Sequence, residues 1–296
     1  MDVRGLIRGR MLFHVAMRDI TSLKVGGRAD ILAFPLDEED LSTLIKYAQK
    51  TRTQYHIIGK CTNILVRDGG IRGMLIDLSK GFNKVNYLAP HRVIAEAGAS
   101  LKRIINLCVE KELQGLEFAC GIPGSLGGAI AMNAGAYGGE IKDLVEEIDI
   151  MEEDGIVRKI KKDYLDFRYR GLHLENQGVI LRAVLKFEKG DNHKIKEQMD
   201  SYNKIRRAGQ AVPFPNAGST FKNPPGISAG RLIEELGLKG LKVGDAMISE
   251  VHGNYIVNAG EASSQDVLTL IGLVKKKALR ERNISLETEI RVVGEE

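Results

Sequence analysis

The stretch that decides the fold is Gly121–Gly139, GIPGSLGGAIAMNAGAYGG, which contains seven glycines and almost no charge. Such small residues contribute little to a hydrophobic core, and they let another surface approach the backbone closely. Glycines also make ordinary turns, but seven of them together with Asn133 and Tyr137 exceed what turning requires. We therefore expect a bound cofactor to lie against this stretch.

Composition is that of a soluble globular protein. The chain has 296 residues, enough for two or three domains, and is 43% hydrophobic and 28% charged. Basic and acidic residues are interleaved and the net charge is only +4, so we expect no nucleic-acid surface, whereas small anions remain candidate ligands. No run approaches the ~20 apolar residues of a membrane span. We expect a cytoplasmic protein without membrane insertion, either a monomer or a weak dimer.

The cysteines and histidines do not indicate a metal site. Cys61, Cys108 and Cys120 are odd in number and lack metal-ligand spacing, and the six histidines are scattered. We therefore expect reduced thiols and no metal.

Hydrophobic periodicity predicts an α+β fold. Residues 29–35 read as a strand, and the segments 37–53 and 99–113 each place apolar residues along one helical face. An antiparallel meander is expected over 144–188, a basic helix over 192–208, and a last alternating strand over 286–294.

Two phosphate-binding motifs are missing, the Walker GxxxxGK[ST] loop and the GxGxxG fingerprint of a βαβ unit. What remains is GKCTN, residues 59–63, between two short apolar runs, together with the glycine-rich stretch. Both would expose backbone N–H groups in tight turns, which can hold a pyrophosphate. For GKCTN alone, a simple turn is an equally good interpretation.

Three further segments carry candidate chemistry, each with an ordinary structural alternative. DFRYRGL places Arg168 and Arg170 on one face of an extended segment, where they either recognise a carboxylate or are merely solvated. Ser219 lies in a turn-rich loop, where a lone serine is most often a turn or capping residue; if it takes part in the chemistry, proton donation fits better than nucleophilic attack. Glu287 and Glu289 share one face of the last strand, either facing solvent or with one carboxylate in a cleft.

Six segments in one order resemble the UDP-N-acetylenolpyruvoylglucosamine reductase family over roughly residues 20–294. They are TSLKVGGRAD (21–30), IIGKCTNILVRDGGIRGMLIDL (57–78), EFACGIPGSLGGAIAMNAGAYGGEI (117–141), FRYRGL (167–172), NAGSTFKNP (216–224) and LETEIRVVG (286–294).

The resemblance implies an α+β fold with an FAD-binding module of the vanillyl-alcohol-oxidase (PCMH) type in two subdomains, followed by a C-terminal substrate subdomain. The expected boundaries are 1–88, 89–190 and 191–296. It also implies an NADPH-dependent, FAD-mediated reduction of UDP-N-acetylglucosamine enolpyruvate to UDP-N-acetylmuramate in peptidoglycan precursor synthesis.

The resemblance further implies roles for individual residues. Arg170, Ser219 and Glu289 fall on the catalytic positions, with Ser219 as the proton donor, and Tyr169, Lys222 and Asn223 on substrate-binding positions. The cofactor-binding positions are Gly59, Lys60, Cys61, Thr62, Asn63, Ile64, Gly121, Ile122, Gly124, Ser125, Gly128, Asn133 and Gly135.

The sequence departs from the family pattern in two places. Cys61 stands where the family usually has glycine, so a positive φ there would strain it. The short spacing between Arg170 and Ser219 resembles the subclass that lacks an inserted tyrosine loop, which leaves Arg206 and Arg207 as candidates to close on the substrate diphosphate. The alternatives are an FAD oxidase or dehydrogenase with another substrate, and a non-catalytic nucleotide-binding module.

Overall fold

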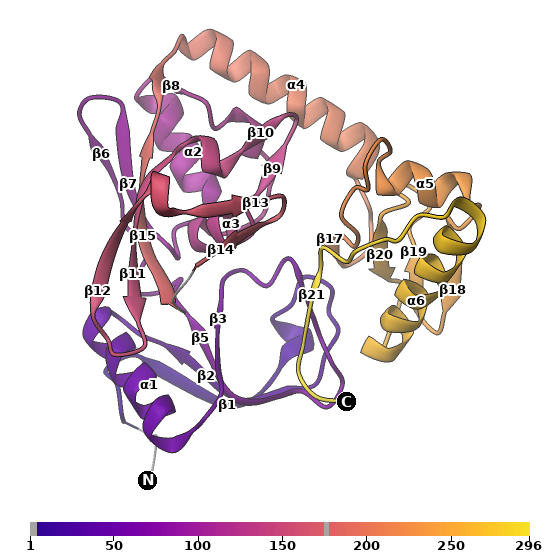
Figure 1. The fold of residues 1–296 in the computed structure, drawn as a ribbon, viewed down its shortest axis with the longest axis horizontal. Helices are drawn as coiled ribbons and strands as arrows, with labels where there is room; N and C mark the ends of the chain where they lie inside the picture. Colours follow the sequence, from indigo (N-terminus) through magenta and orange to yellow (C-terminus); the bar gives the residue numbers. More distant parts are fainter. Residues whose placement is uncertain (1–4, 175–177) are drawn as a thin grey trace. The chain divides into compact units, whose positions relative to one another are not determined.

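The computed structural model describes residues 5–174 and 178–296, which mix helices and strands (Figure 1). The chain divides into two compact units. The first unit holds Ile31–Lys60, Gly73–Arg206 and the N-terminal residues up to Leu12; the second holds Phe13–Asp30, Cys61–Arg72 and Arg207–Glu296. Both units are therefore assembled from separate pieces of the chain.

A four-stranded sheet with the order β1-β2-β5-β3 lies near the N-terminus. Its strands are Arg10–Ala16 (β1), Arg28–Phe34 (β2), Ile71–Asp77 (β5) and Tyr55–Ile58 (β3). Helix α1, Glu38–Thr51, buries Leu41, Leu44 and Ile45 completely, in one core with residues of this sheet. The strand over 29–35 and the helix over 37–53 are confirmed.

A buried carboxylate fixes the start of α1. Asp40, 3% exposed, accepts hydrogen bonds from the backbone N–H groups of Leu36 (3.0 Å), Gly9 (3.0 Å) and Arg8 (3.2 Å). Burial by itself would raise the pKa of Asp40, but these hydrogen bonds and one from the Arg8 side chain outweigh it, so this pKa lies below its ordinary value. The carboxylate therefore joins the N-terminal segment to α1 in its ionised form.

An antiparallel five-stranded sheet forms the largest part of the first unit, in the order β12-β11-β15-β7-β6. Its strands are Val157–Lys161 (β12), Val145–Glu152 (β11), Gly178–Lys186 (β15), Arg92–Glu96 (β7) and Val85–Leu88 (β6). The strands expected over 144–188 and their antiparallel pairing are confirmed, but the meander order is wrong, because β15 pairs with β11 and β7 and not with β12. Helices α2, Leu101–Glu110, and α3, Leu126–Ala131, share one hydrophobic core with this sheet (Figure 1).

Short elements complete the first unit. Three two-stranded sheets are Gly135–Ala136 with Gly139–Glu140 (β9, β10), Asp166–Arg168 with Gly171–His173 (β13, β14), and Leu113–Gln114 with Glu188–Lys189 (β8, β16). The predicted basic helix is α4, Asn192–Gln210.

The second unit contains a four-stranded sheet with the order β17-β20-β19-β18. Its strands are Asn216–Ser219 (β17), Tyr255–Asn258 (β20), Ala246–Ile248 (β19) and Lys242–Val243 (β18). Two helices pack in its core, Ala229–Glu235 (α5) and Ser264–Arg282 (α6). A parallel ribbon joins Ile64–Val66 (β4) to Arg291–Val293 (β21).

The last strand is shorter than predicted. Only Arg291–Val293 of the expected 286–294 strand is regular, so that boundary is wrong. The preceding residues instead bond to the loop after Ser219, with one antiparallel bridge between Phe221 and Thr288. The expected alternation still holds there, since Leu286 and Ile290 are buried and Glu287 is exposed.

Three hydrophobic clusters stabilise the described chain. One lies around α1, one around α2 and α3, and one around α5 and α6. Segments 13–30 and 61–72, expected in the first of three subdomains, lie in the second compact unit. The boundaries 1–88, 89–190 and 191–296 therefore stay a prediction.

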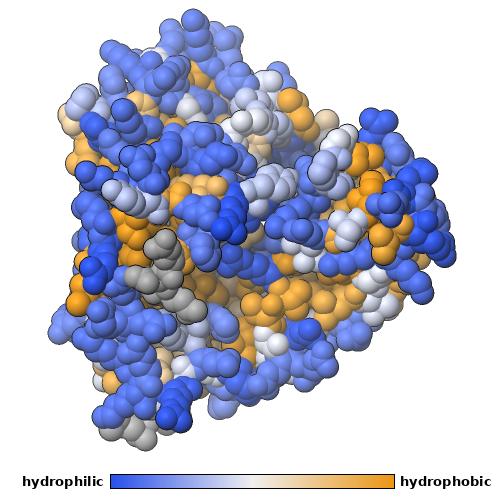
Figure 2. Space-filling model, in the orientation of Figure 1, coloured by the Kyte–Doolittle hydropathy of each residue, from blue (hydrophilic) through white to orange (hydrophobic). Residues whose placement is uncertain are grey.

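Within the described residues, no helix is long and apolar enough to cross a membrane. The face shown in Figure 2 is largely hydrophilic, with apolar residues exposed in separate areas.

Candidate functional site

The glycine-rich stretch contains a short helix that the sequence did not predict. Helix α3 begins after Ser125, whose Oγ accepts a hydrogen bond from the Gly128 N–H. Leu126 and Ile130 are completely buried against the five-stranded sheet. The expectation that this stretch contributes little to the core is therefore wrong for α3, because its few large side chains all point inward.

The backbone around α3 is accessible in the way a cofactor requires. A Cβ added to Gly59 would lie 2.5 Å from Ser125 Oγ, so the first residue of the GKCTN turn touches the start of α3. A Cβ added to Gly124 would meet nothing closer than 3.8 Å. Gly124 is therefore open to close approach, whereas the N–H groups of Leu126 and Gly127 already donate to the carbonyls of Ala99 (2.9 Å) and Ala97 (2.8 Å).

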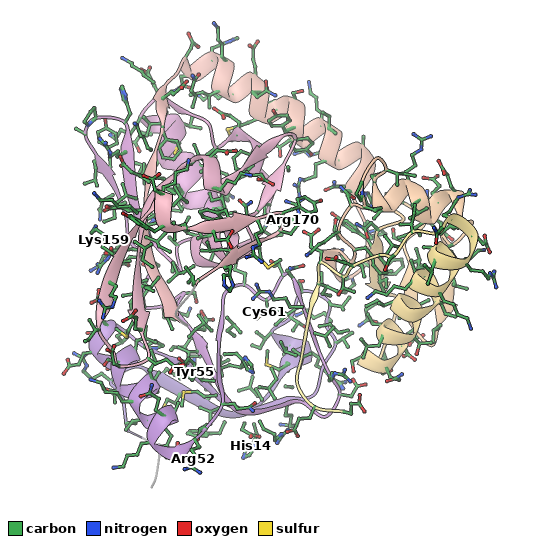
Figure 3. The ribbon with its side chains drawn as sticks, viewed as in Figure 1. His14, Arg52, Tyr55, Cys61, Lys159 and Arg170 are labelled. Atoms are coloured by element: carbon green, nitrogen blue, oxygen red, sulfur yellow. The ribbon has the colours of Figure 1, made fainter. Side chains whose placement is uncertain are left out.

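Cys61 adopts the conformation that glycine favours. Its φ is 50° and its side chain is 5% exposed (Figure 3). The residue's carbonyl accepts a hydrogen bond from the Ser22 N–H at 3.2 Å. The strain expected for a cysteine at this family glycine position is therefore present in the structure.

The rest of the turn leads into β4. Lys60 is exposed, Thr62 is partly buried, and Ile64 is the first residue of β4. The Asn63 side chain donates a hydrogen bond to the backbone carbonyl of Glu289 at 3.2 Å. The second unit thus brings a predicted cofactor residue and a predicted catalytic residue into direct contact.

Arg170 lies in a turn, not in an extended segment. Tyr169 and Arg170 connect β13 to β14, and the φ of Arg170 is 59° (Figure 3). The shared face expected for Arg168 and Arg170 is therefore wrong. The Arg168 side chain bonds to Asp166, and the Arg170 guanidinium carbon lies 5.2 Å from the centroid of the Tyr169 ring.

The hairpin that carries Arg170 is bonded to the glycine-rich stretch. Asn133, completely buried, donates to the Arg168 carbonyl at 3.0 Å and to Glu140 at 3.1 Å, and accepts from the Lys142 N–H. A Cβ added to Gly135 would lie 3.3 Å from Arg170 Nη1. The predicted residues Asn133, Gly135 and Arg170 are thus neighbours, and the Asn133 side chain holds the hairpin in place.

Electrostatics favour an ionised carboxylate beside this turn. Burial acts to raise the pKa of Glu140, but hydrogen bonds from Lys142 and Asn133 lower it more. The charge of Arg170 acts in the same direction, and the pKa of Glu140 lies below its ordinary value. Sequence reasoning missed this carboxylate, since nothing in GGEI distinguishes it from a surface glutamate.

One face of α4 covers both ends of the glycine-rich stretch. The Arg206 Nη1 donates to the Gly121 carbonyl at 3.0 Å, near the predicted cofactor residue Ile122. The Tyr202 ring stacks on Tyr137, with centroids 4.3 Å apart and planes 5° from parallel. Tyr202 was not among the predicted residues, because a tyrosine in a basic helix gives no signal of its partner.

The second unit places Ser219 and Glu289 on adjoining segments. The Glu289 N–H donates to the carbonyl of Thr220, the residue after Ser219, at 2.8 Å. The side chain of Asn254 accepts from the Phe221 N–H (2.9 Å) and donates to the Phe221 carbonyl (2.8 Å). The backbone segments that carry the Ser219 hydroxyl and the Glu289 carboxylate are therefore neighbours, and hydrogen bonds hold both segments.

The two predicted substrate residues of this loop are also fixed. Lys222 Nζ lies 3.1 Å from a carboxylate oxygen of Glu287. The Oδ1 of Asn223 accepts from the Ala229 N–H at 3.0 Å, at the start of α5. Arg170 belongs to the first unit, whereas Ser219 and Glu289 belong to the second.

Metal and thiol chemistry find no support in the part of the chain that the structure describes. No group of three His, Cys, Asp or Glu side chains there could hold a metal ion. Cys61, Cys108 and Cys120 are buried, and burial raises the pKa of Cys108 to about 12.

Comparisons with known proteins show, first, the class of protein to which this chain belongs. A family model described as an FAD binding domain matches residues 29–161. A solved solvent-stable cholesterol oxidase superposes on 64% of this chain and 40% of its own, with a TM-score of 0.50 at 12% identity, which bears on the fold alone. The chain is an α+β flavoprotein of this fold class.

Closer similarities give the family. The model for the C-terminal domain of UDP-N-acetylenolpyruvoylglucosamine reductase matches residues 210–293. The reductase of Clostridium novyi (strain NT) is 44% identical over 96% of this chain and 92% of its own length. The crystal structure of the Thermus caldophilus reductase covers 97% of this chain and 99% of its own, with 37% identity and a TM-score of 0.83. The chain belongs to the UDP-N-acetylenolpyruvoylglucosamine reductase family, and the resemblance read from its motifs is confirmed.

Proposed function

We propose that the protein reduces UDP-N-acetylglucosamine enolpyruvate to UDP-N-acetylmuramate, with FAD as cofactor and NADPH as reductant, in peptidoglycan precursor synthesis. Family membership over nearly the full length supports this reaction. The geometric observation that supports it is the hydrogen bond between the Glu289 N–H and the Thr220 carbonyl, which joins the backbone of Glu289 to the residue after Ser219.

The cofactor-binding residues are assigned to FAD because their glycines let a cofactor approach the backbone closely. The GKCTN turn and the start of α3, which meet at Gly59 and Ser125, would hold the diphosphate, and the segment 129–135 would lie toward the flavin. When bound, FAD supplies the redox chemistry, accepting a hydride from NADPH and passing it to the enolpyruvyl double bond.

Arg170 and Glu289 are assigned to the negative charge that develops on the substrate. Hydride addition at one alkene carbon leaves charge on the other, delocalised into the adjacent carboxylate. Arg170, held in its turn against the Tyr169 ring, would stabilise that charge electrostatically, and Glu289 would do so by hydrogen bonding in its protonated form.

Ser219 is assigned the role of proton donor. Its Oγ–H would donate to the charged carbon, which completes the saturated product. A serine is a weak acid, so it transfers its proton only to a strongly basic centre from which water is excluded. Ser219 is the last residue of β17 rather than a loop residue as expected, and the hydrogen bonds of Asn254 to Phe221 hold the segment that follows it.

The remaining polar residues are assigned to the UDP-sugar. Asn223 has its Oδ1 bonded within the protein, which directs its NH₂ group to the role of donor. Lys222 and Tyr169 complete the predicted set. Arg206 is a candidate for the diphosphate, since its buried Nε has no hydrogen-bond partner among the described residues; Arg207 is the other candidate.

The proposal also covers the location of the protein, its oligomeric state and its binding partners. We expect a cytoplasmic enzyme that is a monomer or a weak dimer and does not bind nucleic acid, in keeping with its small net charge. Gel filtration across a concentration series tests the oligomeric state.

A two-step flavin assay tests the reaction. Protein reconstituted with FAD should be yellow, its flavin should bleach with NADPH, and the colour should return only when the enolpyruvyl substrate is added. Ser219→Ala should keep the NADPH step within about 3-fold and slow the second step by about 10²-fold or more. Ser201→Ala, on the exposed side of α4, is the matched control.

The alternatives give different results. A flavoprotein indifferent to the UDP-sugar would point to an oxidase or dehydrogenase with another substrate. A protein that stays colourless after reconstitution would leave only the non-catalytic nucleotide-binding module. Equal slowing of both steps by Ser219→Ala would refute its role as proton donor.

A further inference from the structure

The backbone of Glu289 is held from both sides. Its N–H donates to the Thr220 carbonyl at 2.8 Å, and its carbonyl accepts from Asn63 Nδ2 at 3.2 Å. Both peptide units that flank this residue are thereby fixed by partners from distant parts of the sequence. The partner on one side follows Ser219, and the partner on the other belongs to the GKCTN turn.

Asn63 binds this segment with its backbone as well as its side chain. The Asn63 carbonyl accepts from the Arg291 N–H at 3.1 Å, and the β4–β21 ribbon continues from there, with Arg291 opposite Ile64. Between the two contacts, Ile290 is 5% exposed and packs in the core. The hydrogen bond from the Asn63 carboxamide thus extends the contacts of the β4–β21 ribbon as far as Glu289.

We propose that Asn63 is a positioning residue for Glu289: its carboxamide sets the direction of the Glu289 peptide and hence of the carboxyl group. This inference rests on the proposed function, in which Glu289 meets the developing charge. A displacement of about 1 Å in such a group costs about 10²-fold in rate. The side-chain bond is a small contribution to folding, since the β4–β21 ladder and the buried Ile290 remain without it.

The inference separates two roles for one residue. Asn63 is predicted to contact the cofactor as part of the turn, and a substitution that only weakened FAD binding would be overcome by adding FAD. A substitution that misplaces Glu289 would persist at saturating FAD. It would also affect the step in which the substrate is reduced and leave the NADPH step unchanged.

The test uses the full chain with two substitutions. Asn63→Asp replaces the donor with a carboxylate that faces the Glu289 carbonyl, whereas Asn63→Ser keeps a shorter donor. The FAD dissociation constant of each variant is measured first, by flavin fluorescence, and kinetics are then followed at saturating FAD. We expect Asn63→Asp to slow flavin reoxidation by the enolpyruvyl substrate about 10- to 100-fold, with bleaching by NADPH within about 3-fold of wild type and Asn63→Ser in between.

A double-mutant cycle with Glu289→Gln identifies the route of the effect. If Asn63 acts through Glu289, adding Asn63→Asp to the Glu289→Gln protein should slow reoxidation by less than about 3-fold, because coupled residues are not additive. Fully additive losses would overturn the inference. So would equal slowing of both flavin steps, or failure of both Asn63 variants to hold FAD, since Asn63 would then act in the cofactor turn itself. A wild-type protein whose reduced flavin ignores the substrate would instead overturn the proposed function, and this inference with it.

Discussion

The loop that follows Ser219 depends on one buried side chain, and its removal has a calculable cost. Asn254 is 3% exposed and pairs with both backbone groups of Phe221, at 2.9 and 2.8 Å. Asn254→Leu keeps the branched shape and the number of heavy atoms but leaves the Phe221 N–H and C=O buried without those partners. Each unsatisfied group costs about 1–3 kcal/mol, so we expect the two groups together to cost about 2–6 kcal/mol in local stability.

Hydrogen exchange measures this loss where it occurs. By 1.4 kcal/mol per tenfold change, peptides covering residues 219–222 should exchange about 30-fold faster or more in the variant, and the midpoint of urea unfolding by far-UV circular dichroism should fall. Asn86→Leu, at an exposed position of β6, is the control and should change neither. Unchanged exchange at 219–222 in the Asn254 variant would refute the reasoning that these two hydrogen bonds hold the loop.

Three further predictions concern stability. Asp40 has a pKa below its ordinary value when folded, so its carboxylate stabilises the folded state fully above about pH 4, and this stabilisation is lost as the pH falls through the folded pKa. The difference in unfolding free energy between the wild type and Asp40→Asn should therefore shrink in acid. A difference that grows in acid would contradict the assignment. Asp68→Ala removes a carboxylate that accepts from the Ser264 N–H at the start of α6 (2.9 and 3.0 Å) and should cost about 2 kcal/mol in urea unfolding, with a loss under about 0.5 kcal/mol as the contrary result. Cys61→Gly should be nearly neutral, since relief of the left-handed φ offsets the lost thiol, whereas Cys61→Val should cost about 2 kcal/mol or more; equal effects would show that φ is not strained.

The sequence by itself determined the class of protein and its chemistry. Glycines 121–139 predicted a ligand close to the backbone, because such an approach requires small residues that appear directly in the sequence. The FAD-binding fold and the family followed from the resemblance of the six motifs in their order, which the comparisons confirm. The spacing of apolar residues predicted α1 and α2, because burial along one helical face leaves a period of 3.6 residues.

Tertiary structure alone decided how the candidate residues are held. The turn at Arg170, the helix α3 inside the glycine-rich stretch and the shortened last strand all differ from the local pattern, because distant partners outweigh local preference there. The bond from Asn63 to Glu289 spans 226 positions in the sequence. A hydrogen bond between one amide and one backbone carbonyl at such a separation produces no periodicity or composition, so only the folded chain reveals it.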